Sequence, residues 1–305
     1  MSTPASKLPL LKLPFLAFKE VLCHMDPVRI LRLSTCSKRS EQFVKLVNMN
    51  LSDQYDLAVH LDHRSKIEFR NRATANIITY TERRDVDDFQ LMAKVVNITE
   101  QAFQYFAVLS KRAFFWLGIS RERDELIHRF ANNHADSIND VSVHGEQTAG
   151  NQTAEDLLRL FKDCESLSVG VQFLENFLCT IPLSPRTLIV ENGFWLRLDD
   201  CWNIPSSGII INGGNYQNVD VNRFLKDWKS GARVNPGLES LTLEKGELNA
   251  VAILADIDHI PNVVQNMQFL SIINDDQERF ADVVDVGTDG FRIIQFQFHL
   301  LGPDE

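Results

Sequence analysis

The sequence predicts a mixed fold of the α+β or α/β class, in which a small unit of three helices precedes a larger domain of strands and helices. Three observations predict it. Apolar residues recur at helical spacing near the start, apolar and polar residues alternate in the next stretch, and short apolar strands then recur with helices between them. With 305 residues the chain is long enough for one large domain or two ordinary ones.

The first helix of the predicted N-terminal unit, residues 8–50, starts at a proline. Pro14 suits the first turn of a helix, because the N–H that proline lacks is not needed there. Phe15, Phe18 and Leu22 then recur at helical spacing and predict one apolar face.

The second and third helices have their own start signals. Asp26 is a good helix cap and Pro27 a good first helical residue, so this pair predicts the end of one helix and the start of the next. Ser37 can cap the third helix in the same way. Because about 40 residues make only a marginal core, we expect this unit to need a partner surface, in the same chain or in another.

Residues 51–135 are predicted to connect the helical unit to the larger domain. Strict alternation of apolar and polar residues predicts a small antiparallel meander of strands at 55–62, 66–71 and 75–82. Helical patterns follow at 86–95, 99–113 and 122–134.

Residues 136–305 contain an irregular repeat of short apolar strands, each closed by a turn signal. Amphipathic helices are predicted between several of them, at 154–164, 171–181 and 219–231. A strand, turn and helix every 21 to 31 residues is the rhythm of a leucine-rich-repeat-like solenoid, although an ordinary α/β sandwich would give the same elements. The central strand positions are Val141, Leu167, Leu188, Ile210, Leu241 and Leu270.

The last two strands, predicted at 282–287 and 292–300, alternate strongly between apolar and polar residues. The turn signal Thr288-Asp289-Gly290 lies between them. We therefore expect a closing antiparallel hairpin at the end of the domain.

Charge and cysteine content limit the partners and the compartment. A net charge of −10 argues against nucleic acid or an anionic membrane as the main partner, because either needs clustered Lys and Arg. The five cysteines are odd in number and include no CxxC pair, which indicates free thiols in a reducing compartment. No signal peptide and no apolar run of about 20 residues occurs, so we expect a cytoplasmic or nuclear protein.

The best candidate for enzyme chemistry is weak. Asp256, Asp258 and His259, with Asp275-Asp276 downstream, could bind a divalent cation, but no second His follows at i+4 and no HExxH or EF-hand spacing occurs. The glycine-rich stretch 211–215 lacks the spacing that phosphate binding needs and predicts a turn. We therefore expect no catalytic residue, no metal and no cofactor, with a metal-dependent hydrolase as the remaining enzymatic alternative.

Three tryptophans in the larger domain could anchor a partner, as exposed aromatic residues often do. Trp228 shares a predicted helix face with Phe224 and Leu225, so it is expected in the core. Trp195 and Trp202 lie in a segment of weaker periodicity and are the candidates for contact with a target protein.

The start of the chain resembles the F-box. It contains Leu13-Pro14, the pair Val21-Leu22, Asp26-Pro27, a leucine-rich second helix and the ending Cys36-Ser37-Lys38-Arg39. It departs from the commonest pattern in two places, and both changes are familiar in the F-box family expanded in nematodes. Phe15 stands where an acidic residue is frequent, and Ser40 stands where a Trp often follows.

A second resemblance lies in the larger domain. Residues 219–229 contain the pattern "asparagine, x, Phe-Leu, x, x, Trp", and residues 235–241 follow with Asn-Pro-Gly-Leu-Glu-Ser-Leu. Both stretches look like the F-box-associated domain of the same family. This resemblance is less specific than the first.

Together the resemblances imply a substrate-recognition subunit of an SCF-type cullin-RING ubiquitin ligase, which performs no bond chemistry itself. The F-box would dock on a Skp-type adaptor and, through it, on the cullin scaffold, while the C-terminal domain would hold an unknown protein target. An alternative is a repeat-type interaction scaffold that is not coupled to ubiquitination, with the three-helix unit as its N-terminal cap. The residues expected to divide between the adaptor interface and the small core are Leu13, Pro14, Phe15, Phe18, Leu22, Pro27 and Leu31.

Overall fold

A computed structural model describes two compact units, each considered separately. The N-terminal unit comprises residues 1–118 and 125–138, and the C-terminal unit comprises residues 119–124 and 139–305. The residues that the structure describes are 10–47, 55–61, 66–80, 113–118, 138–245, 248–264, 267–273, 279–288 and 291–300.

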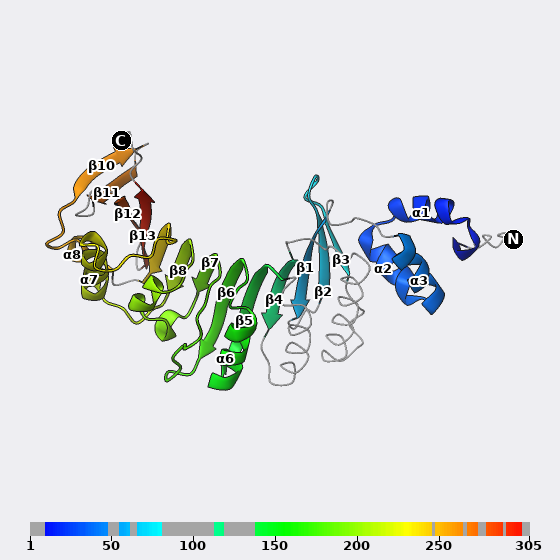
Figure 1. The fold of residues 1–305 in the computed structure, drawn as a ribbon, viewed down its shortest axis with the longest axis horizontal. Coiled ribbons are helices and arrows are strands. Elements are labelled where there is room, and N and C mark those ends of the chain that lie inside the picture. Colours follow the sequence, from blue (N-terminus) through cyan, green and yellow to red (C-terminus); the bar gives the residue numbers. More distant parts are fainter. Residues whose placement is uncertain are drawn as a thin grey trace. The chain divides into compact units, whose positions relative to one another are not determined.

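The N-terminal unit begins with three short helices, which confirms the predicted helical unit (Figure 1). After a 3-10 turn at Leu10–Lys12, the helices are α1 (Phe15–Cys23), α2 (Pro27–Thr35) and α3 (Lys38–Val47). The predicted cap of α2 is formed, because the Asp26 side chain accepts a hydrogen bond of 2.8 Å from the backbone N–H of Arg29.

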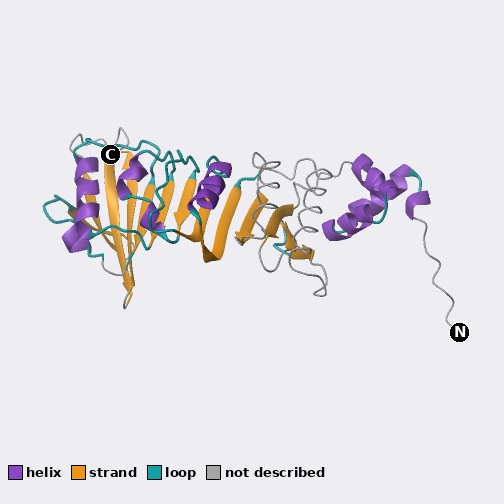
Figure 2. Cartoon of the chain, turned by 90° about the horizontal axis from the view of Figure 1, so that it is seen from below, coloured by secondary structure: helices purple, strands orange, loops and turns teal. Residues whose placement is uncertain are grey.

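The three helices lie together as one group (Figure 2). Aromatic and aliphatic side chains are buried between them. The ring of Phe18 on α1 meets the edge of Phe43 on α3, with the ring centroids 5.3 Å apart. The Ser40 hydroxyl donates to the carbonyl of Ser37 over 2.9 Å, and Ser40 is fully buried. The buried apolar side chains of these three helices include Phe18, Leu22, Val28, Ile30, Leu31, Val44 and Val47.

The strands of the N-terminal unit include the predicted antiparallel meander. They are β1 (Tyr55–Leu61), β2 (Lys66–Asn71) and β3 (Ile77–Tyr80), with β2 paired antiparallel to both neighbours. A fourth strand, β4 (Ala113–Gly118), lies parallel to the other edge of β1.

The strand β4 was not predicted, and the helix predicted at 99–113 overlaps it at Ala113. The sequence AFFWLG is a continuous apolar run, and periodicity alone cannot distinguish such a run in a parallel strand from a buried helix segment. The rest of that helix, and the helices predicted at 86–95 and 122–134, lie outside the described residues.

The C-terminal unit contains a mixed sheet with the strand order β10-β11-β12-β13-β9-β8-β7-β6-β5. The strands from β5 to β9 are parallel to one another, and those from β9 through β13 to β10 are antiparallel. Their bounds are β5 Asp140–Ala149, β6 Ser166–Phe173, β7 Thr187–Val190, β8 Gly208–Asn212, β9 Ser240–Glu244, β10 Ile260–Val264, β11 Met267–Ile273, β12 Arg279–Thr288 and β13 Phe291–Leu300.

One buried row of side chains crosses the five parallel strands. Their register pairs Val141, Leu167, Leu188, Ile209 and Leu241 in turn. The predicted centre of β8 was therefore wrong by one residue, because Ile209 and Ile211 are buried while the Ile210 side chain points to the other face. The sixth predicted position, in β11, belongs to an antiparallel ladder rather than to this row.

The closing hairpin is confirmed and is longer than predicted. β12 and β13 pair antiparallel from Arg279 opposite Leu300 to Thr288 opposite Phe291. Alternate side chains along both strands are buried, including Val283 and Phe296, as the sequence pattern predicts for a sheet with one covered face.

In the part of this unit that the structure describes, three helices and two 3-10 segments accompany the sheet. Helix α6 (Asn151–Leu160) starts three residues earlier than predicted, α7 (Asn218–Lys229) confirms the helix predicted at 219–231, and α8 (Ala250–Ile253) was not predicted. The 3-10 segments are η4 (Gly193–Trp195) and η5 (Leu198–Trp202). None of the helices that the structure describes is long and apolar enough to cross a membrane.

The helix predicted at 171–181 is wrong. β6 continues to Phe173, with Val171 and Phe173 buried and Gln172 exposed between them, so the strand period of two continues through this stretch. Phe177 then packs against Phe173 with their ring centroids 4.7 Å apart, in a chain segment that is not helical. Phe173 and Phe177 are four residues apart, a spacing that also occurs on one face of a helix, and this spacing led to the wrong prediction.

The glycine-rich stretch after β8 is a turn, as predicted. Gly213 has a φ of +65°, which favours glycine, and a Cβ on Gly214 would overlap the Tyr216 ring. The Tyr216 hydroxyl donates to the carbonyl of Ile211 over 2.9 Å, so the turn is fastened back onto β8.

Candidate functional site

An apolar edge lies at the start of α1. It consists of Leu13, Pro14, Phe15 and Leu16, which we call the α1 apolar edge. Leu13 is half-buried and Pro14 is exposed, while Phe15 is 45% exposed and Leu16 78% exposed. Adjacent large apolar side chains in water are a feature of surfaces that bind another protein.

The other four predicted interface residues lie inside the helical unit. Phe18, Leu22 and Leu31 are fully buried, and Pro27 is buried at the first turn of α2. Their contribution to any interface is therefore to support α1 and α2 rather than to contact a partner directly.

A hollow of about 620 Å³ lies in the C-terminal unit where β9 begins and β13 ends. Pockets that hold small ligands commonly have volumes of about 300–1,000 Å³. Segments far apart in the sequence line this hollow: Trp202, Trp228, Asn235, Pro236, Leu238, Glu239, Ser240, Arg279, Gln297, Phe298 and His299.

Aromatic side chains form the apolar part of the hollow. The Trp228 ring on α7 packs against Phe298 on β13, with centroids 5.4 Å apart. Trp202 is stacked on Phe224 at 3.9 Å and is 9% exposed. The backbone N–H of Phe298 donates to the carbonyl of Glu239 over 2.8 Å, so β13 and the start of β9 are held together beside these rings.

Asn235 holds one wall of the hollow in place. Its side-chain amide donates to the carbonyls of Cys201 and Ile204, over 2.9 and 2.6 Å, and its side-chain oxygen accepts from the N–H of Gly237 over 3.1 Å. Asn235 is 8% exposed, so these hydrogen bonds are shielded from water. They tie the loop after α7 to the end of η5.

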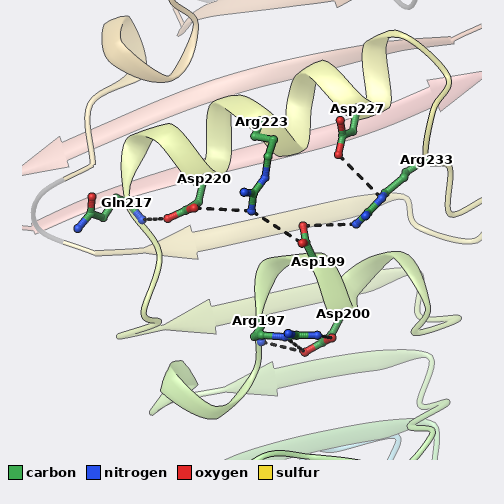
Figure 3. Close-up of polar contacts among 8 residues, drawn as sticks. All are labelled: Arg197, Asp199, Asp200, Gln217, Asp220, Arg223, Asp227 and Arg233. Atoms are coloured by element: carbon green, nitrogen blue, oxygen red, sulfur yellow. Dashed lines mark hydrogen bonds and ion pairs between the residues drawn. The ribbon is translucent and has the colours of Figure 1, made fainter.

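Ion pairs join the same segments on the surface (Figure 3). Asp199 lies between Arg223 and Arg233, with oxygen-to-nitrogen distances of 3.8 and 3.6 Å. Arg233 also lies 3.9 Å from Asp227, and Arg223 lies 3.7 Å from Asp220. Because these side chains are partly exposed, we expect the pairs to orient η5, α7 and the following loop and to add little stability.

The structure places both candidate target-binding tryptophans in the interior. Trp195 is 1% exposed and packs against Phe173 and Phe177, with centroid distances of 5.4 and 6.0 Å. The expectation that Trp195 lies on a contact surface is therefore at odds with its burial, which follows from the aromatic cluster around it. Trp202 is buried as well, but part of it lines the hollow.

Among the described residues, those considered for enzyme chemistry form no metal-binding group. Within the described part of the chain, no group of three or more His, Cys, Asp or Glu side chains could hold a metal ion. Asp256 and Asp258 are exposed, and the Nδ1 atom of His259 lies 2.8 Å from the carbonyl of Ile257. Asp275-Asp276 lies outside the described residues.

The cysteines are all free thiols, and two of them are unreactive at neutral pH. Burial raises the pKa of the Cys201 and Cys164 thiols to about 12. At neutral pH both are therefore protonated, and a protonated thiol is a poor nucleophile.

The structure thus combines one small helical unit, which carries the α1 apolar edge, with one larger α/β unit that contains a hollow. Residues 10–51 match the family model of the F-box domain, and residues 175–243 match the model described as F-box associated. The chain is an F-box protein with a C-terminal F-box-associated domain. No curated protein and no solved structure matches the chain significantly.

The motif residues of the F-box-associated segment have structural roles. Phe224, Leu225 and Trp228 are buried on one face of α7. The Asn222 amide donates to the carbonyls of Ile253 and Ala255 over 2.7 and 2.8 Å, and so ties α7 to α8. The motif therefore specifies how the domain packs around α7.

The sequence reasoning did not identify the hollow. Asn235 and Glu239 stand in the quoted stretch 235–241, but nothing in that stretch indicates that β13, about 60 residues later, completes the wall. Only the pairing of β9 with β13 brings Gln297 beside Ser240.

Proposed function

We propose that this protein is a substrate-recognition subunit of an SCF-type ubiquitin ligase. The observation that carries the proposal is the combination of an F-box domain whose first helix exposes an apolar edge with an F-box-associated domain in the same chain. These two domains are typical of non-enzymatic adaptor proteins.

In this proposal the α1 apolar edge docks on a Skp-type adaptor. Leu13, Pro14 and Phe15 would make the contacts, since they are the predicted interface residues with accessible surface. Phe18, Leu22, Pro27 and Leu31 would hold the helices in the geometry that presents them. Burying the exposed Phe15 side chain alone would contribute about 1 kcal/mol, given its partial exposure.

The C-terminal unit would hold a protein target and present it to a ubiquitin-charged enzyme carried by other subunits. Its contribution to the reaction would be proximity, because binding raises the effective concentration of a target lysine at a distant catalytic centre. The domain division that goes with this role is an F-box at 8–50, a connecting region at 51–135 and a target-binding domain at 136–305.

We propose further that the parallel part of the C-terminal unit is leucine-rich-repeat-like. The support is the row of buried Val, Leu and Ile residues across β5 to β9, one per strand, at spacings of 21 to 32 residues. Such a unit buries its apolar face mainly against its neighbours. An adaptor of this kind would work in the cytoplasm or the nucleus, where cullin-based ligases act.

The proposal is tested by mixing the full chain with a Skp-type adaptor and measuring co-elution by size-exclusion chromatography. We expect the wild type to co-elute and the double variant Leu13→Ala, Pro14→Ala to be lost from the complex. A matched control is Val251→Ser, which changes an 82% exposed apolar residue on α8 and should leave co-elution unchanged.

Circular dichroism of each variant separates loss of binding from loss of fold. Co-elution of the double variant at wild-type levels would remove the α1 apolar edge from the interface. Failure of the folded wild type to co-elute would favour the alternative, a scaffold that is not coupled to ubiquitination.

A further inference from the structure

We propose that the hollow beside Trp202, Trp228 and Phe298 binds an arginine side chain of the target protein. This inference rests on the proposed function, because it names the chemistry by which the C-terminal unit would recognise its target. Three observations carry it: the aromatic lining, the one unpaired carboxylate, and the interactions that both basic residues of the lining make within the chain.

The aromatic lining suits a flat cation. Trp228 and Phe298 pack against each other and both line the hollow, and Trp202 lines it from η5. Aromatic faces attract cations through their quadrupole, and a planar guanidinium can stack on them as well. A lysine ammonium lacks the planar surface that stacks in this way.

The unpaired charge in the lining is negative. Glu239 is exposed, and within the described residues its carboxylate makes no hydrogen bond and no ion pair. A carboxylate at the edge of an aromatic hollow can accept two hydrogen bonds from a guanidinium, which adds both strength and directional specificity.

Ser240 and Gln297 also line the hollow, and the register of β9 and β13 places them opposite each other. Because side chains alternate along a strand, these two side chains point to the face of the sheet opposite to the one on which Phe298 packs against Trp228. The guanidinium would therefore meet Glu239 and the aromatic rings rather than these two side chains.

Both basic residues of the lining take part in interactions within the chain. His299 lies with its Nε2 atom 3.7 Å from an Asp282 carboxylate oxygen and stacks on Phe280 at 4.6 Å. Arg279 also takes part in an interaction within the chain. A cationic ligand can therefore bind the unpaired carboxylate of Glu239. An anionic ligand would have to compete with Asp282 for His299.

The acidity of the whole chain supports the same choice. A net charge of −10 favours encounter with basic segments and disfavours acidic ones. The volume of about 620 Å³ leaves room for one long side chain and the peptide backbone on either side of it.

The experiment measures binding of short peptides to the full chain by isothermal titration calorimetry. The probe is acetyl-Gly-Ser-Arg-Ser-Gly-amide, and the matched control replaces arginine with citrulline, which keeps the shape and removes the charge. Peptides with lysine or glutamate at the same position complete the set. We expect the arginine peptide to bind at least tenfold more tightly than any of the other three.

Changes in the hollow identify the site. The substitution Glu239→Gln should weaken binding of the arginine peptide about tenfold, which corresponds to about 1.4 kcal/mol, and should leave the melting temperature unchanged. Glu175→Gln, an exposed carboxylate on the turn after β6, makes the same change in net charge and should have no effect. The indole N–H signals of Trp202 and Trp228 in NMR spectra should shift on addition of the arginine peptide and remain unchanged with citrulline.

The proposal is wrong if the citrulline or lysine peptide binds as tightly as the arginine peptide, or if the glutamate peptide binds more tightly. It is also wrong if Glu239→Gln keeps the wild-type affinity for the arginine peptide. Absence of binding at millimolar concentrations of the arginine peptide would overturn it as well. Co-elution of Glu239→Gln with the Skp-type adaptor is measured in parallel. If co-elution persists while peptide binding fails, the adaptor function stands and only the assigned target chemistry is wrong.

Discussion

At the scale of single residues, the C-terminal unit depends on side-chain amides that bind backbone carbonyls. Asn222 joins α7 to α8, and Asn235 joins the loop after α7 to the end of η5. A buried amide that meets most of its hydrogen-bonding capacity fixes one geometry, because any displacement leaves buried polar atoms unpaired. Both asparagines belong to the stretches that resemble the F-box-associated domain.

Replacing Asn235 should destabilise the C-terminal unit. Asn235→Ala leaves the carbonyls of Cys201 and Ile204 and the N–H of Gly237 without their partner. We expect a loss of about 3 kcal/mol in the free energy of unfolding, measured by urea denaturation.

The matched control is Asn203→Ala. Asn203 lies in the chain between Cys201 and Ile204, whose carbonyls Asn235 binds, but its own side chain is exposed and makes no hydrogen bond within the described residues. The control should change the free energy of unfolding by less than about 0.5 kcal/mol. Equal effects of the two substitutions would show that Asn235 does not hold the loop.

At the scale of secondary-structure elements, local signals explain the helical unit well. Pro14, Asp26 and Ser37 stand directly before the first residues of α1, α2 and α3. Each acts on its own helix through neighbouring backbone groups, so no tertiary contact is needed to recognise it. The antiparallel strands β1, β2, β12 and β13 were also predictable, because alternation records which face of a strand is buried.

The α2 cap gives a test at this scale. Asp26→Ala removes the acceptor of the Arg29 N–H and a carboxylate oxygen that lies 3.0 Å from the Arg29 side chain. We expect a loss of about 1 kcal/mol in the stability of the helical unit. Hydrogen exchange followed by mass spectrometry should show faster exchange in peptides from α2.

The conservative variant Asp26→Asn keeps an oxygen that can accept the same hydrogen bond. Its exchange in α2 should therefore stay close to that of the wild type, since Asn caps helices about as well as Asp. If both variants exchange equally fast, the charge of Asp26 would matter more than the cap.

At the scale of the whole molecule, the question is whether the helical unit is independent or a cap for the sheet. The described contact between helices and strands in the N-terminal unit includes the Arg32 guanidinium, 5.7 Å from the Tyr80 ring centroid. Tyr80 is buried, and a cation–π contact contributes about 1–2 kcal/mol, which is small compared with the stability of a domain.

We therefore expect the C-terminal unit to remain folded after deletion of residues 1–50. Its cooperative melting transition, followed by circular dichroism, should shift by less than a few degrees. Arg32→Ala in the full chain is the companion variant and should be nearly silent. Loss of the transition on deletion would instead favour the three helices as an N-terminal cap of a scaffold protein.

The sequence by itself determined the elements whose signals are local. These are the three helices with their caps, the alternating strands, the helix α7 and the resemblance carried by residues 13–40. Such signals act between residues near one another in the chain, so they can be read without knowing the fold.

The tertiary structure decided everything that depends on distant segments meeting. Trp195 is buried by Phe173 and Phe177, and Ile209 rather than the predicted Ile210 joins the buried row. The strand β4 forms beside β1. All three findings depend on neighbours that the sequence does not identify. The hollow is the clearest case, because Trp202, Glu239 and Gln297 come together only when β9 pairs with β13 beside η5 and α7. The physical reason is that packing and strand pairing join residues through space, and no local pattern records the partner.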